Sequence, residues 1–177
     1  MKKLIVLIAA LLAALFVAGC ASKPAAPTGP SAADLMADTR SGAPSGVVVG
    51  QATGASQSAA ETNAINQLRR GLKYIVGESV DAQVQSGRLT SAVSTDLKQT
   101  IGTVLDRTPL SGAVKVGSGA DGSGRGYAVY SIDKASALSL INSAATTAKE
   151  TVQGSGNFNP NNGFDDQFVK AAAREWK

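Results

Sequence analysis

The sequence has no histidine and a single cysteine, and aromatic side chains make up only 5% of its 177 residues. The lack of histidine excludes Ser-His-Asp and Cys-His activation of a nucleophile, and it excludes zinc and iron sites built on imidazole. With Cys20 as the only thiol, no disulfide forms within one chain. We therefore expect a non-enzymatic protein that has no cofactor, no metal ion and no small-molecule substrate.

Charge is also scarce. The chain has 17 basic and 13 acidic side chains, and Lys2 and Lys3 lie in the first segment, so 15 basic side chains face 13 acidic ones in the rest. The densest basic group, Arg69-Arg70-Lys73, is typical of a solvated helix face. We expect no nucleic-acid partner.

The first twenty residues have the order of an export signal. Lys2 and Lys3 precede an uncharged apolar run from Leu4 to Val17, and small residues then lead to Cys20. The run is too short to cross a hydrocarbon layer of about 30 Å comfortably as a permanent helix. A plain secretory signal with a chance cysteine and an uncleaved anchor remain the alternatives.

The ending Val17-Ala18-Gly19-Cys20 resembles the lipobox of bacterial lipoproteins. The resemblance implies that the signal is removed and that Cys20 carries covalent lipid, a diacylglycerol thioether with an acyl chain such as palmitate on the new amino terminus. Two or more acyl chains hold a protein stably to a bilayer. Ala21 replaces the aspartate of inner-membrane lipoproteins, which implies an outer-membrane anchor facing the periplasm, with exposure at the cell surface left open.

The composition divides the chain into four segments. Residues 1–19 form the signal peptide, and residues 20–45 form the lipidated cysteine and a flexible linker rich in proline and small residues. Residues 46–153 form an α/β domain, and residues 154–177 form a loop and a C-terminal helix. A brief helical stretch at 31–40 is counted with the linker, whose roughly 25 residues give an r.m.s. span of about 25–30 Å.

The domain's apolar pattern predicts an α+β fold, in which a small three-stranded sheet packs against a long helix and two shorter helices, plus a C-terminal helix. The long helix is expected behind a capping box of Ser58 and Glu61, and the shorter ones begin at Thr90 and Asp133. Strands are expected at 46–54, 110–117 and 126–132, with a long flexible hairpin tip at 117–125.

Two motifs that suggest catalysis or nucleotide binding lack the context they require. Gly117 to Gly122 matches G-x-G-x-x-G, but a strand follows where a phosphate-binding helix is needed. Ser131 to Lys134 matches S-x-x-K, but the chain has neither the Lys-Thr-Gly nor the Ser-Asp-Asn motif of penicillin-recognising enzymes. We interpret both matches as chance.

The domain resembles the LPP-twenty family of outer-membrane lipoproteins over about residues 46–150. The resemblance is carried by Val48-Val49-Gly50-Gln51-Ala52-Thr53-Gly54, by Ala60, Ala64 and Leu68, and by Gly126-Tyr127-Ala128-Val129-Tyr130. The family includes antigenic surface lipoproteins and the flagellar disk lipoprotein FlgP. It implies a fold and a structural role, and no catalytic residue is carried over.

The leading hypothesis is a structural or assembly role in the cell envelope, with self-association and a link to the flagellum suggested by the resemblance. The edge strand at 46–53 is a candidate for pairing with another copy. Phe164, Phe168 and Trp176 share one face of the expected tail helix and are candidate partner contacts, although the tail could equally dock on its own domain. The alternative function is a non-enzymatic accessory that binds or activates a periplasmic envelope partner.

Overall fold

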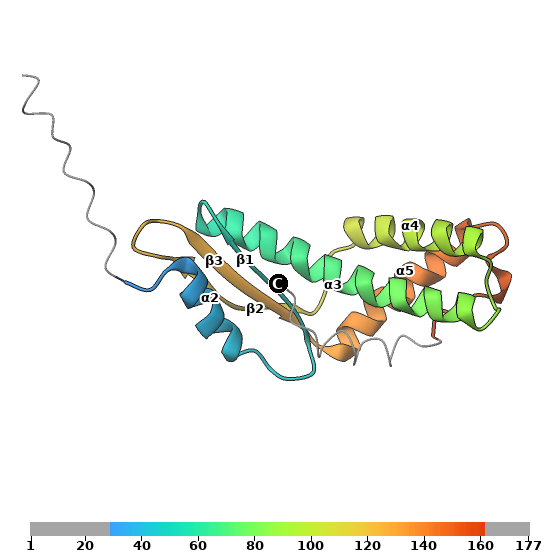
Figure 1. Ribbon diagram of the computed structural model, residues 1–177, viewed down its shortest axis with the longest axis horizontal. Coiled ribbons are helices and arrows are strands. Elements are labelled where there is room, and N and C mark those ends of the chain that lie inside the picture. Colours follow the sequence, from blue (N-terminus) through green and yellow to red (C-terminus); the bar gives the residue numbers. More distant parts are fainter. Residues whose placement is uncertain (1–28, 162–177) are drawn as a thin grey trace, which may run out of the picture.

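The computed structural model describes residues 29–161, and Figure 1 shows the arrangement of its elements. The predicted α+β fold class is confirmed. The elements are α2 (Ala32–Ser41), β1 (Val48–Gly54), α3 (Gln57–Gln85), α4 (Ser91–Arg107), β2 (Ala113–Ala120), β3 (Gly126–Ile132), α5 (Lys134–Thr151) and the short 3-10 helix η1 (Ser155–Asn157). The C-terminal helix expected from about Asp165 lies outside the described residues.

The three strands form one antiparallel sheet in the order β1-β3-β2, so β3 is central. β1 pairs with β3 from Val48 opposite Ile132 to Gly54 opposite Gly126. β2 pairs with β3 from Ala113 to Ala120, with a bulge between Lys115 and Gly117. In Figure 1, α3 covers one face of this sheet and α2 crosses the other.

Helix α3 lies unusually close to the sheet because small residues meet there. A Cβ atom on Gly50 would stand 2.6 Å from the backbone nitrogen of Leu68 and 2.8 Å from its Cβ. Gly54 and Gly126 meet the first turn of α3 in the same way. Beneath them the core consists of Ala60, Ala64 and Ala128. Backbone therefore packs on backbone at this end of the sheet, and no larger side chain fits at Gly50 without a shift.

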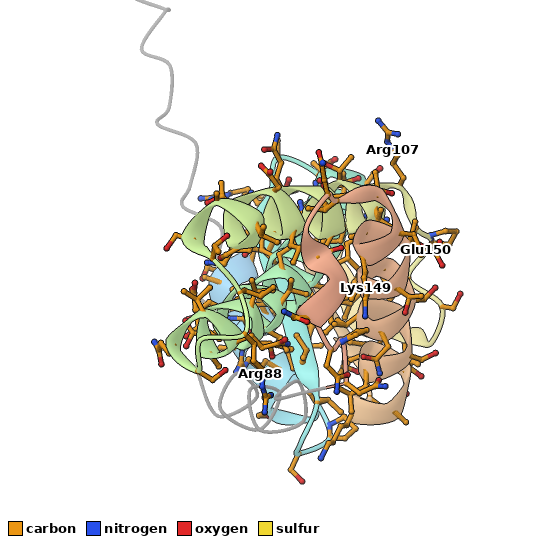
Figure 2. All side chains as sticks on the ribbon, turned by 90° about the vertical axis from the view of Figure 1, so that its right-hand side faces the viewer. Arg88, Arg107, Lys149 and Glu150 are labelled. Atoms are coloured by element: carbon orange, nitrogen blue, oxygen red, sulfur yellow. The ribbon has the colours of Figure 1, made fainter. Side chains whose placement is uncertain are left out.

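Beyond the sheet, α3 continues into a bundle with α4 and α5. Figure 2 views the free end of this bundle, where Arg88 of the α3–α4 connection and Lys149 of α5 are labelled. Large aliphatic side chains fill the bundle and join the sheet core through Val48 and Ile132. The main contributors from the helices are Leu68, Leu72, Ile75, Val76, Val80, Leu97, Ile101, Leu105 and Ile141.

Two residues of the predicted basic group, Arg69 and Lys73, bond to α4, and Arg70 is exposed. The Arg69 guanidinium donates hydrogen bonds to the carbonyls of Leu105 and Thr108, at 3.3 and 3.2 Å, and so satisfies acceptors at the end of α4. Lys73 of α3 forms an ion pair with Asp106 of α4. These contacts fix α4 along α3.

The start of α3 differs from the prediction. The helix is capped by Ser56, whose Oγ accepts a hydrogen bond from the Ala59 nitrogen at 3.2 Å, so the capping box of Ser58 and Glu61 is wrong. Glu61 instead forms an ion pair with Lys115 of β2. No local sequence pattern indicates this pairing. The predicted cap Asp133 is confirmed, and the helix predicted from about Thr90 begins at Ser91 with Thr90 as its N-cap.

The brief helical stretch predicted at 31–40 is present as α2, but counting it with the flexible linker is wrong, because α2 is folded onto the sheet. Ser31 and Asp34 form a capping box at its start, and Ala32 is almost fully buried. Arg40 donates a hydrogen bond to the Gln51 side chain of β1 at 3.2 Å. α2 contacts all three strands, so the folded body begins at Ser31.

The hairpin tip is shorter and better ordered than predicted, since β2 continues to Ala120. The Asp121 carboxylate accepts hydrogen bonds from the hydroxyl of Ser123, the nitrogens of Ser123 and Arg125, and the nitrogen of Ala32 at 3.0 Å. Asp121 therefore holds the turn together and ties it to the first residue of α2.

The predicted domain boundary at 153 is also too early, because Phe158 belongs to the core. Its side chain is 1% exposed, at the far end of the bundle. The side-chain amide of Gln83 donates to the Asn159 carbonyl at 2.9 Å and accepts from the Asn159 nitrogen at 3.1 Å. This two-way contact holds the segment that carries Phe158 against α3.

Replacing Gly50 with alanine tests the close packing of α3 on the sheet. We expect Gly50→Ala to lower the free energy of unfolding by about 1–3 kcal/mol, because the new Cβ overlaps the α3 backbone. Gly77→Ala is the matched control, since a Cβ there meets nothing within 4 Å and alanine favours the helix by about 1 kcal/mol. Chemical denaturation measures both; equal effects of the two changes would contradict the packing argument.

Truncating Phe158 tests the extended domain boundary. We expect Phe158→Ala to lower the free energy of unfolding by about 3–5 kcal/mol, because a fully buried ring is replaced by a cavity. Asn157→Ala, at an exposed neighbouring position, should change it little. A small effect of Phe158→Ala in thermal unfolding would show that the domain ends before this residue.

Candidate functional site

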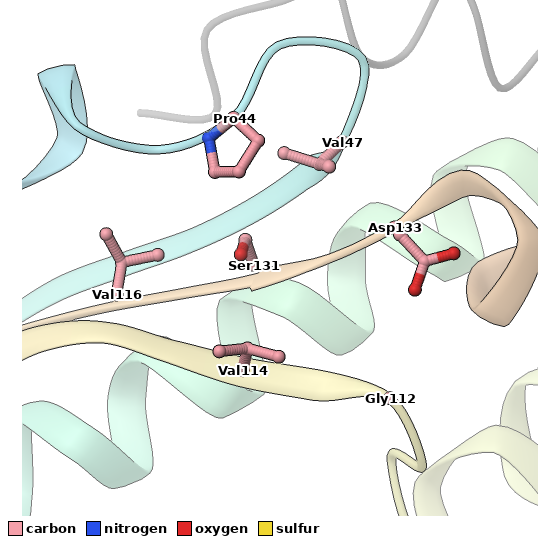
Figure 3. Close-up of a pocket in the computed structure, with 7 residues that line it drawn as sticks. All are labelled: Pro44, Val47, Gly112, Val114, Val116, Ser131 and Asp133. Atoms are coloured by element: carbon pink, nitrogen blue, oxygen red, sulfur yellow. The ribbon is translucent and has the colours of Figure 1, made fainter.

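The sheet face opposite α3 is only half covered. α2 crosses the half near the hairpin tip, and the other half carries an open groove of about 320 Å³. Figure 3 shows its lining residues, which are Pro44, Val47, Gly112, Val114, Val116, Ser131 and Asp133. Val114 is 61% exposed and is the one exposed large hydrophobic residue of the described part. We consider this groove the candidate functional site.

Local backbone geometry places the two valines of β2 in the groove. Gly112 has a φ of 85°, a conformation that glycine adopts readily, at the turn before β2 begins. Val114 and Val116 are two residues apart on β2 and both line the groove, beside the bulge between Lys115 and Gly117. Lys115 points to the other face, where it meets α3.

The polar groups of the groove are few. Ser131 lies between the two outer strands and is 6% exposed. The Asp133 carboxylate accepts hydrogen bonds from the hydroxyl and the nitrogen of Ser136, at 2.6 and 2.9 Å. The Ser136 hydroxyl lowers the pKa of Asp133, which stays ionised as the N-terminal cap of α5. The groove is therefore suited chiefly to apolar contact.

Both outer strands present edges without a free charge. β1 contains no charged residue, and Lys115 is the only one in β2. Its ammonium pairs with Glu61 at 2.8 Å and lies 5.9 Å from the centroid of the Tyr130 ring. Charged side chains on an edge strand commonly prevent pairing with another chain. The charge of Lys115 is instead paired with Glu61 on the α3 side.

The seam between α3 and β2 is a polar cluster centred on Glu61. Its carboxylate accepts hydrogen bonds from Lys115 at 2.8 Å, from Ser118 at 2.7 Å and from Gln57 at 3.2 Å. The Lys115 contact, followed by those of Ser118 and Gln57, lowers the pKa of Glu61 to about 2. The Glu61 carboxylate raises the pKa of Lys115 in return. The lysine stays protonated and the carboxylate ionised, so the cluster clamps β2 to α3.

The groove and the hairpin tip lie at opposite ends of the sheet. The Ser123 hydroxyl is the main cause that lowers the pKa of Asp121 to about 2, so this carboxylate stays ionised and keeps its bond to Ala32. The chain that precedes Ser31 therefore enters the body beside the tip, and α2 then leads to Pro44 and the groove (Figure 1).

All four residues proposed from the sequence, Cys20, Phe164, Phe168 and Trp176, lie outside the described residues. The sequence did not predict the groove, although Val114 and Val116 lie in the strand expected at 110–117. Their two-residue spacing placed them on one face, but nothing local showed that α2 leaves this end of that face uncovered.

Two further classes of site are not found in residues 29–161. No group of three or more acidic or cysteine side chains there is arranged to hold a metal ion. Within the same range, no helix has both the length and the apolar character needed to cross a bilayer.

Replacing Glu61 with glutamine tests the clamp through its pH dependence. Because the pKa of Glu61 falls from 4.5 to about 2 on folding, its contribution to stability is complete above pH 4.5 and is lost as the pH falls towards 2. We expect Glu61→Gln to lower the melting temperature at pH 7, and the difference from the parent to shrink between pH 4.5 and 2. Glu78→Gln on the same helix is the control, and a constant difference across this range would contradict the clamp.

A scan against protein-family models and searches of the curated proteins and of the solved structures find no match to this chain. The resemblance to the LPP-twenty lipoproteins therefore remains a prediction from the residues quoted above. Function has to be inferred from the chain's own residues and from their arrangement.

Proposed function

We propose that this chain is a lipoprotein of the outer membrane, anchored through lipid on Cys20, with a structural or assembly role in the cell envelope. One observation carries the proposal. The chain enters the folded body at the hairpin tip, held by Asp121 on Ala32, and the open apolar groove lies at the opposite end of the sheet. An anchor at one end and a contact surface at the other suit a protein whose role is to hold something at a membrane.

The folding of α2 shortens the tether that the sequence predicted. Ten residues, 21–30, separate Cys20 from Ser31. Covalent geometry limits ten residues to at most about 36 Å. The proposed anchor therefore keeps the hairpin tip within about 36 Å of the membrane.

The chemistry of the groove favours a protein contact. Val47, Val114 and Val116 offer apolar surface, and the Asp133 carboxylate is already occupied by Ser136. The groove is open to solvent and is bordered by β2, whose outer residues include the exposed Val114 and whose one charge is paired with Glu61. The proposed partner is another copy or an envelope protein, and the proposed association with the flagellum rests on the family resemblance alone.

Lipid attachment is tested by labelling cells with a palmitate analogue. We expect the parent chain to be labelled and to fractionate with the outer membrane, and Cys20→Ser to lose both properties because the thioether needs the thiol. Ser22→Ala is the matched control and should behave as the parent. Ala21→Asp should move the labelled protein to the inner membrane. An unlabelled parent chain would overturn the anchor.

The structural role is tested by deleting the protein from its source bacterium. The proposal expects a defect in envelope integrity or motility that the parent chain restores and Cys20→Ser does not. Crosslinking in the same cells distinguishes the two kinds of partner, since self-association gives multiples of the chain's own mass and an accessory role gives adducts with another protein.

A further inference from the structure

Helices α3, α4 and α5 are arranged as three corners of a four-helix bundle. α4 packs along both α3 and α5, whereas α3 and α5 contact each other at few positions, as helices on a diagonal do. Among residues 29–161 no helix lies at the fourth corner, between α3 and α5 on the side away from α4. We name this position the α3–α5 seam.

The directions of the three helices alternate. α3 runs away from the sheet, and the ion pairs Asp81–Lys98 and Lys73–Asp106 show that α4 runs back beside it. α5 follows β3 directly and ends at the free end of the bundle, where Lys149 is labelled in Figure 2. A fourth helix that runs from the free end back towards the sheet is therefore antiparallel to both α3 and α5, as in an up-down-up-down bundle.

The chain after α5 crosses to α3 at the free end. η1 packs against α5, and the Phe158 ring lies in the core. The Gln83 side chain of α3 then holds Asn159 through two hydrogen bonds, at 2.9 and 3.1 Å. The described chain reaches Asn161 two residues later. Residues 162–177 therefore start at the outer end of the α3–α5 seam.

We propose that residues 164–176 form the fourth helix of the bundle, packed in the α3–α5 seam and directed back to the groove. Phe164 and Phe168 then lie in the seam, and Trp176 reaches Val47 at the border of the groove. The proposal goes beyond the proposed function and does not rest on it, because the contact lies within one chain and is the same with or without the lipid anchor.

The sequence of this segment suits such a position. Phe164, Phe168 and Trp176 fall on one side of a helix at 100° per residue, and Lys170 and Arg174 fall on the opposite side. A helix with one apolar side needs a surface that covers this side. The core of the bundle, which is made of large aliphatic side chains, provides that surface at the fourth corner.

The length of the segment fits the seam. α5 has 18 residues and is about 27 Å long, so its start lies about that far from the free end. The three steps from Asn161 to Phe164 span at most about 11 Å. The twelve helical steps from Phe164 to Trp176 add about 18 Å. Together they bring Trp176 to the level of Asp133, where α5 begins.

Val47 lies at the sheet end of the seam. Val48 pairs with Ile132, so Val47 is level with Asp133, the N-terminal cap of α5. β1 packs on α3, and its start therefore lies beside both helices of the seam. Val47 and Asp133 also line the groove, as Figure 3 shows. The seam and the groove meet at Val47, and a tryptophan there covers apolar surface on the border of the groove.

Trp176 is the only tryptophan of the chain, so its fluorescence reports on this contact alone. In the full chain purified in detergent, we expect emission at a shorter wavelength than in urea and several-fold weaker quenching by acrylamide. Val47→Asp should move the emission to longer wavelength and raise the quenching several-fold, because a carboxylate replaces the apolar contact. Thr146→Asp on the exposed side of α5 is the matched control and should change neither. Circular dichroism verifies that both variants fold.

Two results of the fluorescence experiment would contradict the proposal. Quenching of the parent chain equal to that in urea would show that Trp176 packs on nothing. A shielded Trp176 that Val47→Asp leaves unchanged would show that the segment lies in the detergent or on another part of the body.

A cysteine pair tests the position in membranes. Val47→Cys combined with Trp176→Cys should form a disulfide within one copy on mild oxidation, detected by mass spectrometry as linked peptides from the monomer band of a non-reducing gel. The single variants measure any link to Cys20. Thr146→Cys with Trp176→Cys is the matched control and should give several-fold less product. Equal yields from the two pairs, links only between copies, or no link at all would overturn the proposal.

Discussion

The backbone contact between α3 and the sheet is the constraint on which the rest of the structure depends. Gly50, Gly54 and Gly126 bring the strands so close to the helix that only alanine fits between them, as Ala60 and Ala64 do. Such a contact leaves little freedom in the position of the helix, because no flexible side chain lies between it and the strands to adjust. The same helix, 29 residues long, then sets where α4 and α5 pack beyond the sheet.

The open groove exists because the two faces of the sheet are covered unequally. α3 covers one sheet face along its length, and the other face receives only α2, a helix of ten residues. Because Asp121 holds the start of α2 at the hairpin tip, this short helix covers that end and leaves the Val114 end exposed. One carboxylate thus determines both where the preceding chain enters and which part of the sheet stays open.

The sequence predicted the elements with a strong local signal. The stripe of α3, the start of α4 near Thr90, the cap Asp133 and the three strands were evident from periodicity and turn residues. What it missed depends on contacts between distant residues. Glu61 suited a capping box until Lys115, 54 positions away, proved to be its partner. Phe158 stands among glycine and asparagine, so it appeared as loop. The helical stretch at 31–40 was recognised, but its short length before Gly42 and Pro44 placed it in the linker. The groove depends on how far α2 extends across the sheet face, and no local pattern shows that α2 leaves Val114 uncovered.

The packing of α3 also explains why the β1 edge carries no protecting charge. Positions that face α3, such as Gly50 and Gly54, are too close to the helix backbone to hold any side chain, and Ala52 belongs to the alanine core. Positions on the other face lie towards α2, where Val49 is buried and Gln51 is bonded by Arg40. An inward-pointing charge, one of the common means by which proteins block edge pairing, has no room at these positions. The close contact that builds the fold therefore leaves β1 no position on the α3 face at which a charged side chain could stand.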